Sequence, residues 1–385
     1  MRRLLNRRLD GLGTTVFAEM TELARRTGAI NLGQGFPDTD GPATVLEAAV
    51  QAIRGGHNQY PPGPGIPELR EAVAAHQRRR YGLEYDPDGE VLVTTGATEA
   101  IAAAILALVE PGDEVVALEP YYDSYAACIA LAGGIRAPVA LRPPDFRLDL
   151  DELRAAITGR TRLLLINTPH NPTGAVLDRT ELTALAELAS ERDLLVVTDE
   201  VYEHMVFDGE HIPLATLPGM RERTISIGSA GKTFSVTGWK VGWVTSAPEL
   251  VAAVRSAKQF LTFVSGGPFQ HAVAYALNTL PDAFYAEQRE HLRRKRDLLC
   301  GGLERAGFTV FRPHGTYFVT TDVAALGEPD GRAFCLELAH RCGVVAVPNA
   351  VFYDRKDLGA TQVRFAFCKR DEVLAEAVDR LGRLR

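Results

Sequence analysis

The sequence predicts a protein of the α/β class, in which a mainly parallel sheet is flanked by helices and a smaller second domain is present. Three observations support this class. The middle of the chain alternates short β-branched runs with longer stretches of helix formers. Several runs are apolar at consecutive positions, which is typical of strands buried on both faces of a sheet. Glycine or polar residues directly follow the runs, and ligands bind at the carboxyl ends of strands in open α/β sheets.

The elements follow from these patterns in chain order. The predicted strands of the large sheet are 91–95, 114–118, 162–167, 194–198, 224–227 and 241–245. The stretches 97–109 and 181–191 between them predict helices, whereas runs at 315–319 and 363–367 are typical of antiparallel strands. We therefore expect a large domain at 41–285. A small α+β domain is expected to combine residues 1–40, including an N-terminal arm, with residues 286–385.

Composition narrows the class of function. The 385 residues carry a net charge of −7, with 46% hydrophobic and 24% charged residues, so neither nucleic acid nor an anionic membrane is an expected partner. No apolar run approaches the roughly 20 residues that cross a bilayer. The five scattered cysteines form no C-x-x-C pair. We expect free thiols in a reducing cytoplasm, with neither disulfides nor a metal site.

One short motif suggests a different enzyme class. Gly231-Lys232-Thr233 follows a predicted strand, as in a phosphate-binding P-loop. The P-loop spacing requires glycine five positions before Gly231, where Ser226 stands. The acidic strand that ends at Glu200 also precedes the lysine loop instead of following it. The sequence therefore does not favour a nucleotide hydrolase.

The polar residues after the strands suit a different ligand. An aldehyde cofactor with a pyridine ring and a phosphate needs a lysine, an acid at the ring nitrogen, donors at the ring hydroxyl and an anion cradle. Segments 167–174, 198–202 and 229–240, in this order, resemble the class I and II aminotransferases of PLP fold type I. The similarity covers nearly the whole chain, from 31–37 to 363–365. It implies pyridoxal 5′-phosphate as cofactor and ping-pong transfer of an amino group to a 2-oxo acid, with 2-oxoglutarate expected.

The resemblance implies a role for each residue of the catalytic centre. Lys232 is expected to hold the cofactor as an internal aldimine and then to move the proton between substrate Cα and cofactor C4′. Asp199 is expected to keep the pyridine nitrogen protonated, although an aspartate after a strand is also a common helix N-cap. Asn171 and Tyr202 would hydrogen-bond the ring hydroxyl. Tyr122 would stack on the ring, with its neighbour Tyr121 as the alternative.

The same resemblance assigns the phosphate and carboxylate sites. Backbone N–H groups of Ala97 and Thr98, at the start of a predicted helix, face an anion, and Ser229 and Lys240 add a hydroxyl and a positive charge. Tyr60 is expected to reach the phosphate of the partner subunit, which implies a homodimer with shared active sites.

The substrate contacts complete the expected site. Arg364 is expected to grip the substrate α-carboxylate through its planar fork, together with Asn167 and the backbone of Gly35. Aromatic residues could line the side-chain pocket, and they favour large or flexible side chains over aspartate. These residues are Phe17, Phe36, Tyr60, Tyr121, Phe260 and Phe263.

The amino donor stays open at this level. Segments 228–234 and 238–243 resemble kynurenine/glutamine aminotransferases, whereas 38–42, 58–65, 97–104, 267–270 and 365–370 are closer to actinobacterial N-succinyldiaminopimelate aminotransferases. The short segment 352–362 and Asn349, where serine is usual, depart from the latter pattern near the expected substrate mouth. Kynurenine, glutamine, methionine and an N-succinyldiaminopimelate-like donor are all candidates. β-Elimination from cysteine conjugates would use the same lysine and aspartate and is the alternative reaction.

Overall fold

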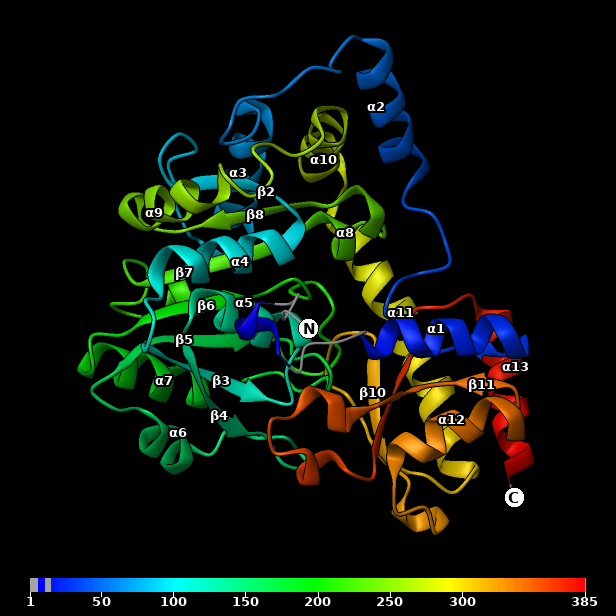
Figure 1. Ribbon diagram of the computed structural model, residues 1–385. Coiled ribbons are helices and arrows are strands. Elements are labelled where there is room, and N and C mark those ends of the chain that lie inside the picture. Colours follow the sequence, from blue (N-terminus) through cyan, green and yellow to red (C-terminus); the bar gives the residue numbers. More distant parts are fainter. Residues whose placement is uncertain (1–5, 11–14, 385) are drawn as a thin grey trace, which may run out of the picture.

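A computed structural model describes residues 6–10 and 15–384. Seven strands form its large sheet in the spatial order β2-β8-β7-β6-β5-β3-β4 (Figure 1). β8 is antiparallel to both of its neighbours, and the other neighbouring pairs are parallel. The predicted α/β class with a mainly parallel mixed sheet is confirmed. The strands are β2 (Val91–Thr95), β3 (Glu114–Glu119), β4 (Ile135–Ala140), β5 (Thr161–Asn167), β6 (Leu195–Asp199), β7 (Thr224–Ser229) and β8 (Val241–Thr245).

The consecutive apolar residues of a strand enter two different cores. Leu163 and Leu165 of β5 pack with one set of helices, whereas Leu164 and Ile166 pack with another on the opposite face. Because successive side chains of a strand point to opposite faces, burial of both faces requires this uninterrupted apolar pattern. The first set is α4 (Gly96–Leu108), α5 (Asp123–Ala132) and α9 (Pro248–Lys258), and the second is α6 (Leu150–Ala156) and α7 (Arg179–Glu191).

One strand of the large sheet was not predicted. β4 contains Pro138 and lies at the edge of the sheet, next to β3 alone. Proline cannot donate a backbone hydrogen bond, so it is tolerated in an edge strand but weakens the sequence signal for a strand. At the opposite end of the sheet, β2 and β8 pack against α2 (Ala43–Arg54), α3 (Pro67–Tyr81) and α10 (Gly267–Thr279).

A second, antiparallel sheet lies beside the first, in the order β12-β13-β10-β9. The strand expected at 315–319 begins only at Phe318, because Thr316 has a positive φ of 66° that interrupts extended backbone. The strands are β9 (Thr309–Phe311), β10 (Phe318–Asp322), β12 (Val347–Pro348) and β13 (Gln362–Ala366), and β1 (Ile30–Asn31) pairs in parallel with β11 (Val344–Val345).

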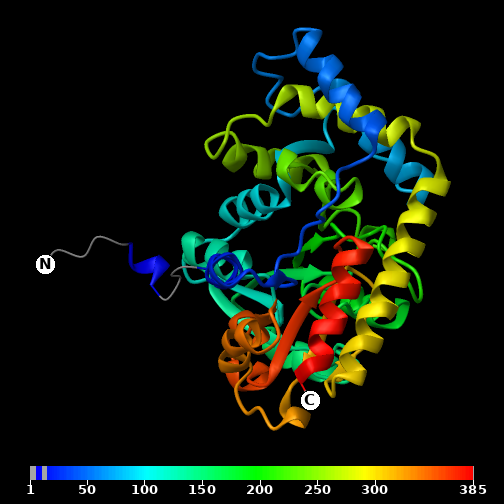
Figure 2. The same cartoon turned by 90° about the vertical axis from the view of Figure 1, so that its right-hand side faces the viewer.

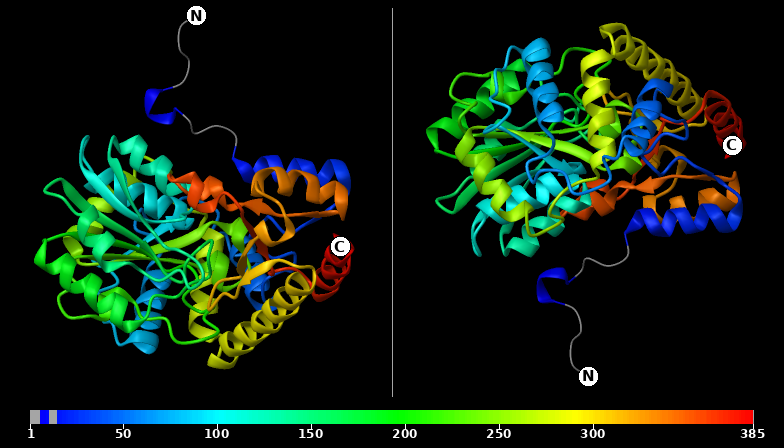
Figure 3. Two further views of the ribbon diagram at one scale, coloured as in Figure 1. Left: turned by 90° about the horizontal axis from the view of Figure 1, so that it is seen from below. Right: turned by 90° about the horizontal axis from the view of Figure 1, so that it is seen from above.

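Helices from both ends of the chain cover this second sheet. The N-terminal helix α1 runs beside α12 (Figure 3), and the long α11 runs beside α13 (Figure 2). Tyr285, near the start of α11, packs in the core around β2 and β8, whereas Leu292 to Leu303 pack in the second core, so α11 joins the two parts. The helices are α1 (Val16–Thr27), α11 (Asp282–Arg305), α12 (Gly331–Arg341) and α13 (Asp371–Leu381).

The association of residues 15–40 with the C-terminal part supports our proposal that 1–40 and 286–385 form the small domain and 41–285 the large one. Residues 1–5, 11–14 and 385 lie outside the described part of the chain. Across residues 6–10 and 15–384, no helix has both the length and the apolarity that a membrane span requires.

Candidate active site

A cavity of about 370 Å³ opens at the edge of the large sheet where β2, β5, β6 and β7 end. This volume is within the usual range for small-molecule sites. Phe17 and the predicted residues of the cofactor and carboxylate sites line it, with the exception of Tyr60. They are Phe17, Gly35, Ala97, Thr98, Tyr122, Asn167, Asn171, Asp199, Tyr202, Ser229, Lys232, Lys240 and Arg364.

Lys232 lies in α8 (Ala230–Thr233), the single helical turn that directly follows β7. Its ammonium donates to the Tyr317 hydroxyl at 2.9 Å and to the Gly35 carbonyl at 3.4 Å. Burial lowers the pKa of Lys232 to about 8, although nearby Cys368 and Asp199 favour the charged form. A buried amine of this kind is partly uncharged near neutral pH, and the uncharged amine is the nucleophile toward an aldehyde.

Asp199 is the last residue of β6 and is buried. Its Oδ2 accepts a hydrogen bond from the Tyr125 hydroxyl at 2.6 Å, and its Oδ1 accepts a longer one from the Val201 N–H at 3.4 Å. Burial raises the pKa of Asp199 to about 6, against the effect of these hydrogen bonds and of Lys232. A cationic N–H donor placed in the cavity would stabilise this carboxylate by a charge-assisted hydrogen bond.

An anion cradle lies at the start of α4. Gly96 has a positive φ of 72°, and a Cβ built on it would lie 3.1 Å from Lys240 Nζ, so glycine lets the lysine approach this turn. Ala97 and Thr98 follow in the first helical turn, where backbone N–H groups are free to bind an anion. Ser229, at the end of β7, lines the same part of the cavity.

Tyrosine and asparagine side chains complete the walls. The buried Tyr202 packs edge-on against Tyr317, with ring centroids 5.3 Å apart, and burial raises the pKa of its hydroxyl. The Asn171 N–H donates to Asn167 Oδ1 at 2.8 Å. The Asn167 amide in turn donates to the Asp199 carbonyl at 2.8 Å, so these two strand ends hold each other in place.

Arg364 of β13 brings a buried guanidinium to the cavity. It donates to Asn171 Oδ1 at 2.8 Å and to the Gly33 carbonyl at 3.0 Å, while its Nε has no partner among the described residues. Burial lowers the pKa of Arg364 to about 10. Within residues 6–10 and 15–384, no carboxylate lies within 4 Å of it, and its carbon Cζ lies 4.0 Å from the centroid of the Phe318 ring. The cavity therefore presents an unpaired cation suited to a ligand carboxylate.

The candidates for the side-chain pocket separate into three groups. Phe17 and Phe36 line the cavity. Tyr121 is buried but does not line it, because its backbone and ring face the segment around Phe352 and Asp354. The side chains of the remaining candidates lie on the surface, outside the cavity of their own chain, and they are Tyr60, Phe260 and Phe263, at 82%, 84% and 52% exposed.

Asn349 and the segment 352–362, which depart from the N-succinyldiaminopimelate aminotransferase pattern, lie in different places. Asn349 is fully buried and donates to Thr320 Oγ1 at 3.1 Å, so it does not line the cavity. The segment 352–362 is fastened to the large sheet instead. The Tyr121 N–H donates to the Phe352 carbonyl at 2.9 Å, and the Asp354 N–H donates to the buried carboxylate of Glu119 at 2.8 Å.

Phe318, Tyr317 and Tyr125 contact this centre and were not predicted as site residues. Tyr317 holds Lys232, and its hydroxyl also donates to the Gly35 carbonyl at 2.6 Å. Tyr125 holds Asp199. The only sequence signal for Tyr125 is its position three residues after Tyr122, which is the N-cap of α5.

These groups fit a phosphorylated pyridine aldehyde. The amine with a lowered pKa, the buried carboxylate and the cradle beside Lys240 lie around one cavity. Each supplies what a different part of such a molecule needs, namely a nucleophile, a partner for a protonated ring nitrogen and donors for a phosphate.

Comparisons with known proteins agree with this geometry. Residues 27–381 match the family model "Aminotransferase class I and II". The chain is 56% identical to a "probable N-succinyldiaminopimelate aminotransferase" of Mycobacterium tuberculosis over 97% of both chains. It is 41% identical to methionine aminotransferase of Escherichia coli, covering 98% and 97% of the two chains, and 37% identical to human kynurenine–oxoglutarate transaminase 1, covering 98% and 97%. The solved structure of N-succinyldiaminopimelate aminotransferase from M. tuberculosis superposes with a TM-score of 0.97, covering 99% and 100%.

The raised pKa of Asp199 predicts a stability effect in protein freed of bound small molecules. A carboxyl group whose folded-state pKa is raised from 3.8 to about 6 stabilises the fold when protonated, and this stability is lost as pH rises through that window. Asp199→Asn should therefore raise the free energy of unfolding at pH 7.5 by up to about 3 kcal/mol, and by much less at pH 4.5. Urea unfolding at the two pH values measures this, with the exposed Asp379→Asn as control. An equal loss of stability at both pH values would contradict the prediction.

Proposed function

This chain belongs to the class I and II aminotransferases, and on that premise we propose that Lys232, Asp199 and Arg364 carry the activity of the family at the cavity. The enzyme transfers amino groups between an amino acid and a 2-oxo acid with pyridoxal 5′-phosphate as cofactor. The observation that carries the proposal is the placement of a lysine with a lowered pKa, a buried aspartate and an unpaired arginine around one space.

The proposed binding roles are those that the family resemblance implies, and the placement of the side chains around one cavity supports them. Lys232 would hold the cofactor covalently, and Asp199 would keep the ring nitrogen protonated. The start of α4, Ser229 and Lys240 would bind the phosphate. Asn171 and Tyr202 would hydrogen-bond the ring hydroxyl, and Tyr122 would cover one face of the ring. Tyr122 is preferred to Tyr121 because only Tyr122 lines the cavity.

The chain's own residues then handle the substrate. When bound, the cofactor supplies a positively charged ring that delocalises the electron pair left at the substrate Cα. Arg364 binds the α-carboxylate with its two-pronged guanidinium and, with Asn167 and Gly35, fixes the Cα–H bond relative to Lys232. Once the substrate amine has displaced it from the cofactor, the free Lys232 Nζ would take the proton from Cα and deliver it to cofactor C4′, and its lowered pKa suits this step near neutral pH.

For the amino donor we propose N-succinyldiaminopimelate, with 2-oxoglutarate as the acceptor. The 56% identity to the M. tuberculosis protein, over 97% of both chains, supports this donor. A second candidate class consists of large apolar amino acids such as methionine and kynurenine, which Phe17 and Phe36 would accommodate in the cavity wall. Glutamine is a candidate donor only through the resemblance to kynurenine/glutamine aminotransferases, and the human kynurenine transaminase is less similar to this chain, at 37% identity. The alternative β-elimination reaction is not favoured by the relatives, which are named for amino transfer.

A donor panel tests this assignment. Glutamate formation from 2-oxoglutarate should be supported best by N-succinyl-L,L-diaminopimelate, with kcat/KM at least about 10-fold above L-methionine, L-kynurenine, L-glutamine and L-aspartate. Arg364→Lys should reduce kcat/KM for every donor alike, because all share the carboxylate, whereas Phe17→Ala should change their ranking.

Two results would contradict different parts of the proposal. A ranking led by methionine or kynurenine would reject the proposed donor while leaving amino transfer intact. Release of pyruvate and ammonia from a cysteine conjugate, without glutamate formation from any donor, would reject amino transfer itself.

The quaternary arrangement that we propose is a homodimer with shared active sites. Tyr60 is 82% exposed and lies outside the cavity of its own chain. It packs edge-on against Phe263, with centroids 5.4 Å apart, and Phe260 nearby in sequence is 84% exposed. Exposed aromatic clusters of this kind mark interaction surfaces. A second copy of the chain would cover the cluster and bring Tyr60 to the partner's phosphate cradle.

A mixing experiment distinguishes shared from separate sites. A chain with Lys232→Ala and a chain with Tyr60→Ala are each expected to be impaired alone. If Tyr60 serves the partner subunit, a mixed dimer contains one intact site, so refolding the two variants together should restore up to half of the wild-type activity per mixed dimer. No restoration in mixed dimers that are isolated by two different affinity tags would contradict shared sites.

We place the enzyme in the cytoplasm. The five cysteines are all buried and free, including Cys368 beside Lys232, which suits a reducing compartment.

A further inference from the structure

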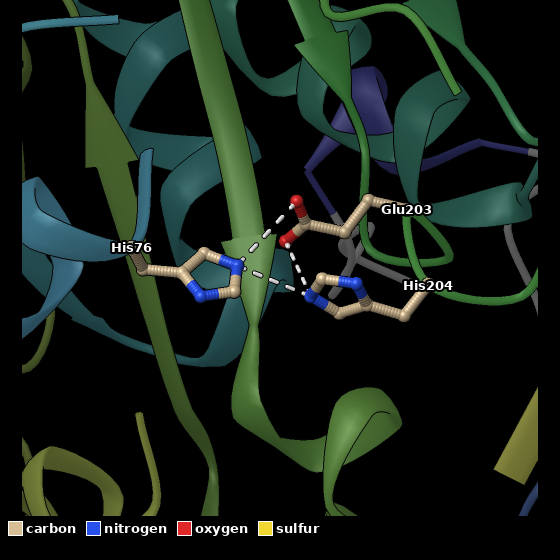
Figure 4. Close-up of side chains that lie close together, drawn as sticks. All are labelled: His76, Glu203 and His204. Carbon is tan, nitrogen blue, oxygen red and sulfur yellow. Dashed lines mark hydrogen bonds and ion pairs between the residues drawn. The ribbon is translucent and has the colours of Figure 1, made fainter. Parts of the chain in front are cut away.

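A second cluster of chemistry-bearing side chains lies apart from the cavity. His76 comes from α3, whereas Glu203 and His204 come from the turn after β6, directly after Tyr202 (Figure 4). The three side chains are 1%, 3% and 8% exposed. The two Nε2 atoms lie 3.2 Å apart, and the Glu203 carboxylate oxygens lie 4.0 Å from His76 Nε2 and 3.8 Å from His204 Nε2.

This set of atoms matches a known class of ligand sphere. Two imidazole nitrogens and one carboxylate, with a further position for solvent, form one of the common zinc sites in proteins. Nitrogens bound to one tetrahedral Zn²⁺ at about 2.0–2.1 Å lie roughly 3.3 Å apart. The observed 3.2 Å agrees with that spacing. A carboxylate can swing about its side-chain bonds to bring one oxygen to the same point, because Glu203 approaches both histidines from one side (Figure 4).

The buried carboxylate of the cluster would be stabilised by a cation. The Glu203 oxygens lie 4.0 Å from His76 Nε2 and 3.8 Å from His204 Nε2, so an ion between these groups would offset the cost of burying the carboxylate. An imidazole in its neutral form keeps a lone pair for a metal. The guanidinium of Arg80 faces the cluster and would repel a bound cation, but it is paired with the Asp282 carboxylate at 2.8 Å.

Other charged groups surround the cluster without entering it. Arg79 and Arg289 act on the histidines from α3 and α11, and each lowers the pKa of one of them. Glu200 raises the pKa of Glu203, and it is hydrogen-bonded to His211 Nε2 at 3.0 Å. The Nε2 atom of His211 is therefore already hydrogen-bonded to the Glu200 carboxylate, so we do not include His211 among the proposed ligands.

Neighbouring groups complete the features of a metal site. The Tyr81 hydroxyl donates to Glu203 Oε2 at 2.5 Å and orients the carboxylate, as outer-sphere partners do for metal ligands. A cavity of about 350 Å³, bordered by Tyr81, Glu203, His204 and His211, opens beside the cluster and gives solvent access to it.

We propose that His76, Glu203 and His204 bind one divalent transition-metal ion, with Zn²⁺ as the best-fitting ion. The ion joins α3 to the turn that carries Tyr202, which is three residues after the last residue of β6. Bound there, the ion would fix the backbone from which Asp199 and Tyr202 reach the active-site cavity. The site is independent of the proposed residue roles and of the amino donor.

The test is zinc binding to the purified holoenzyme, first stripped with a chelator and then dialysed. Competition with a chromophoric chelator should show one Zn²⁺ per chain with Kd below about 1 µM. His204→Gln and Glu203→Gln should each weaken binding at least about 100-fold, and Tyr81→Phe about 10-fold. His211→Gln, a buried histidine beside the same cavity, should leave the affinity unchanged. X-ray absorption at the zinc edge should show two imidazole ligands at about 2.0–2.1 Å.

Defined results would overturn the proposal. Wild-type Kd above about 100 µM would mean that the 3.2 Å contact is only a hydrogen bond between two neutral rings. Affinity that His204→Gln and Glu203→Gln leave unchanged would also overturn it. Loss of the ion in His271→Gln would assign binding to the other close histidine pair, His57 and His271, whose centroids lie 3.9 Å apart. Glu203→Gln keeps a group that can accept the Tyr81 hydrogen bond, so it carries the test if the histidine variant does not fold.

Discussion

The removal of three charged groups from water is the constraint that shapes this protein. Lys232, Asp199 and Arg364 lie around one cavity. Burial shifts the pKa values of these groups to about 8, 6 and 10, and each shift favours the neutral form. Leaving such charges without full compensation costs free energy in the fold. Ligands that bring a carboxylate, a cationic ring nitrogen or a phosphate recover that free energy on binding, so stability is exchanged for affinity at this site.

The fold makes this arrangement possible because helices cover both faces of the sheet and leave its carboxyl edge open. The ends of β5 and β6 place Asn167 beside Asp199, β7 brings Ser229 to the same cavity, and the second sheet supplies Arg364. Supporting hydrogen bonds, such as the one from Tyr125 to Asp199, hold the charged groups in position. Asn167, Asp199 and Arg364 are therefore positioned by packed strands, which hold side chains more precisely than loops do.

The sequence predicted the fold class. It also predicted that the polar residues after the apolar strands lie together, because parallel strands end at one edge of a sheet. It could not reveal contacts between distant segments. Tyr317 contacts Lys232 at a sequence separation of 85 residues, and His76 contacts His204 at a separation of 128 residues. No local sequence pattern predicts either contact. The sequence also gave no expectation of a metal, since two histidines and a glutamate so separated match no spacing motif. The edge strand β4 was missed because Pro138 weakens its pattern.

The central claim is that Lys232 is the residue that binds the cofactor covalently. Borohydride reduction of the holoenzyme fixes the link between cofactor and lysine, and peptide mass spectrometry then locates it. The account predicts a single pyridoxyl phosphate adduct on Lys232, absent from Lys232→Ala, even though Lys240 lines the same cavity. An adduct on Lys240 or on the buried Lys258, or no adduct in protein saturated with pyridoxal 5′-phosphate, would contradict it.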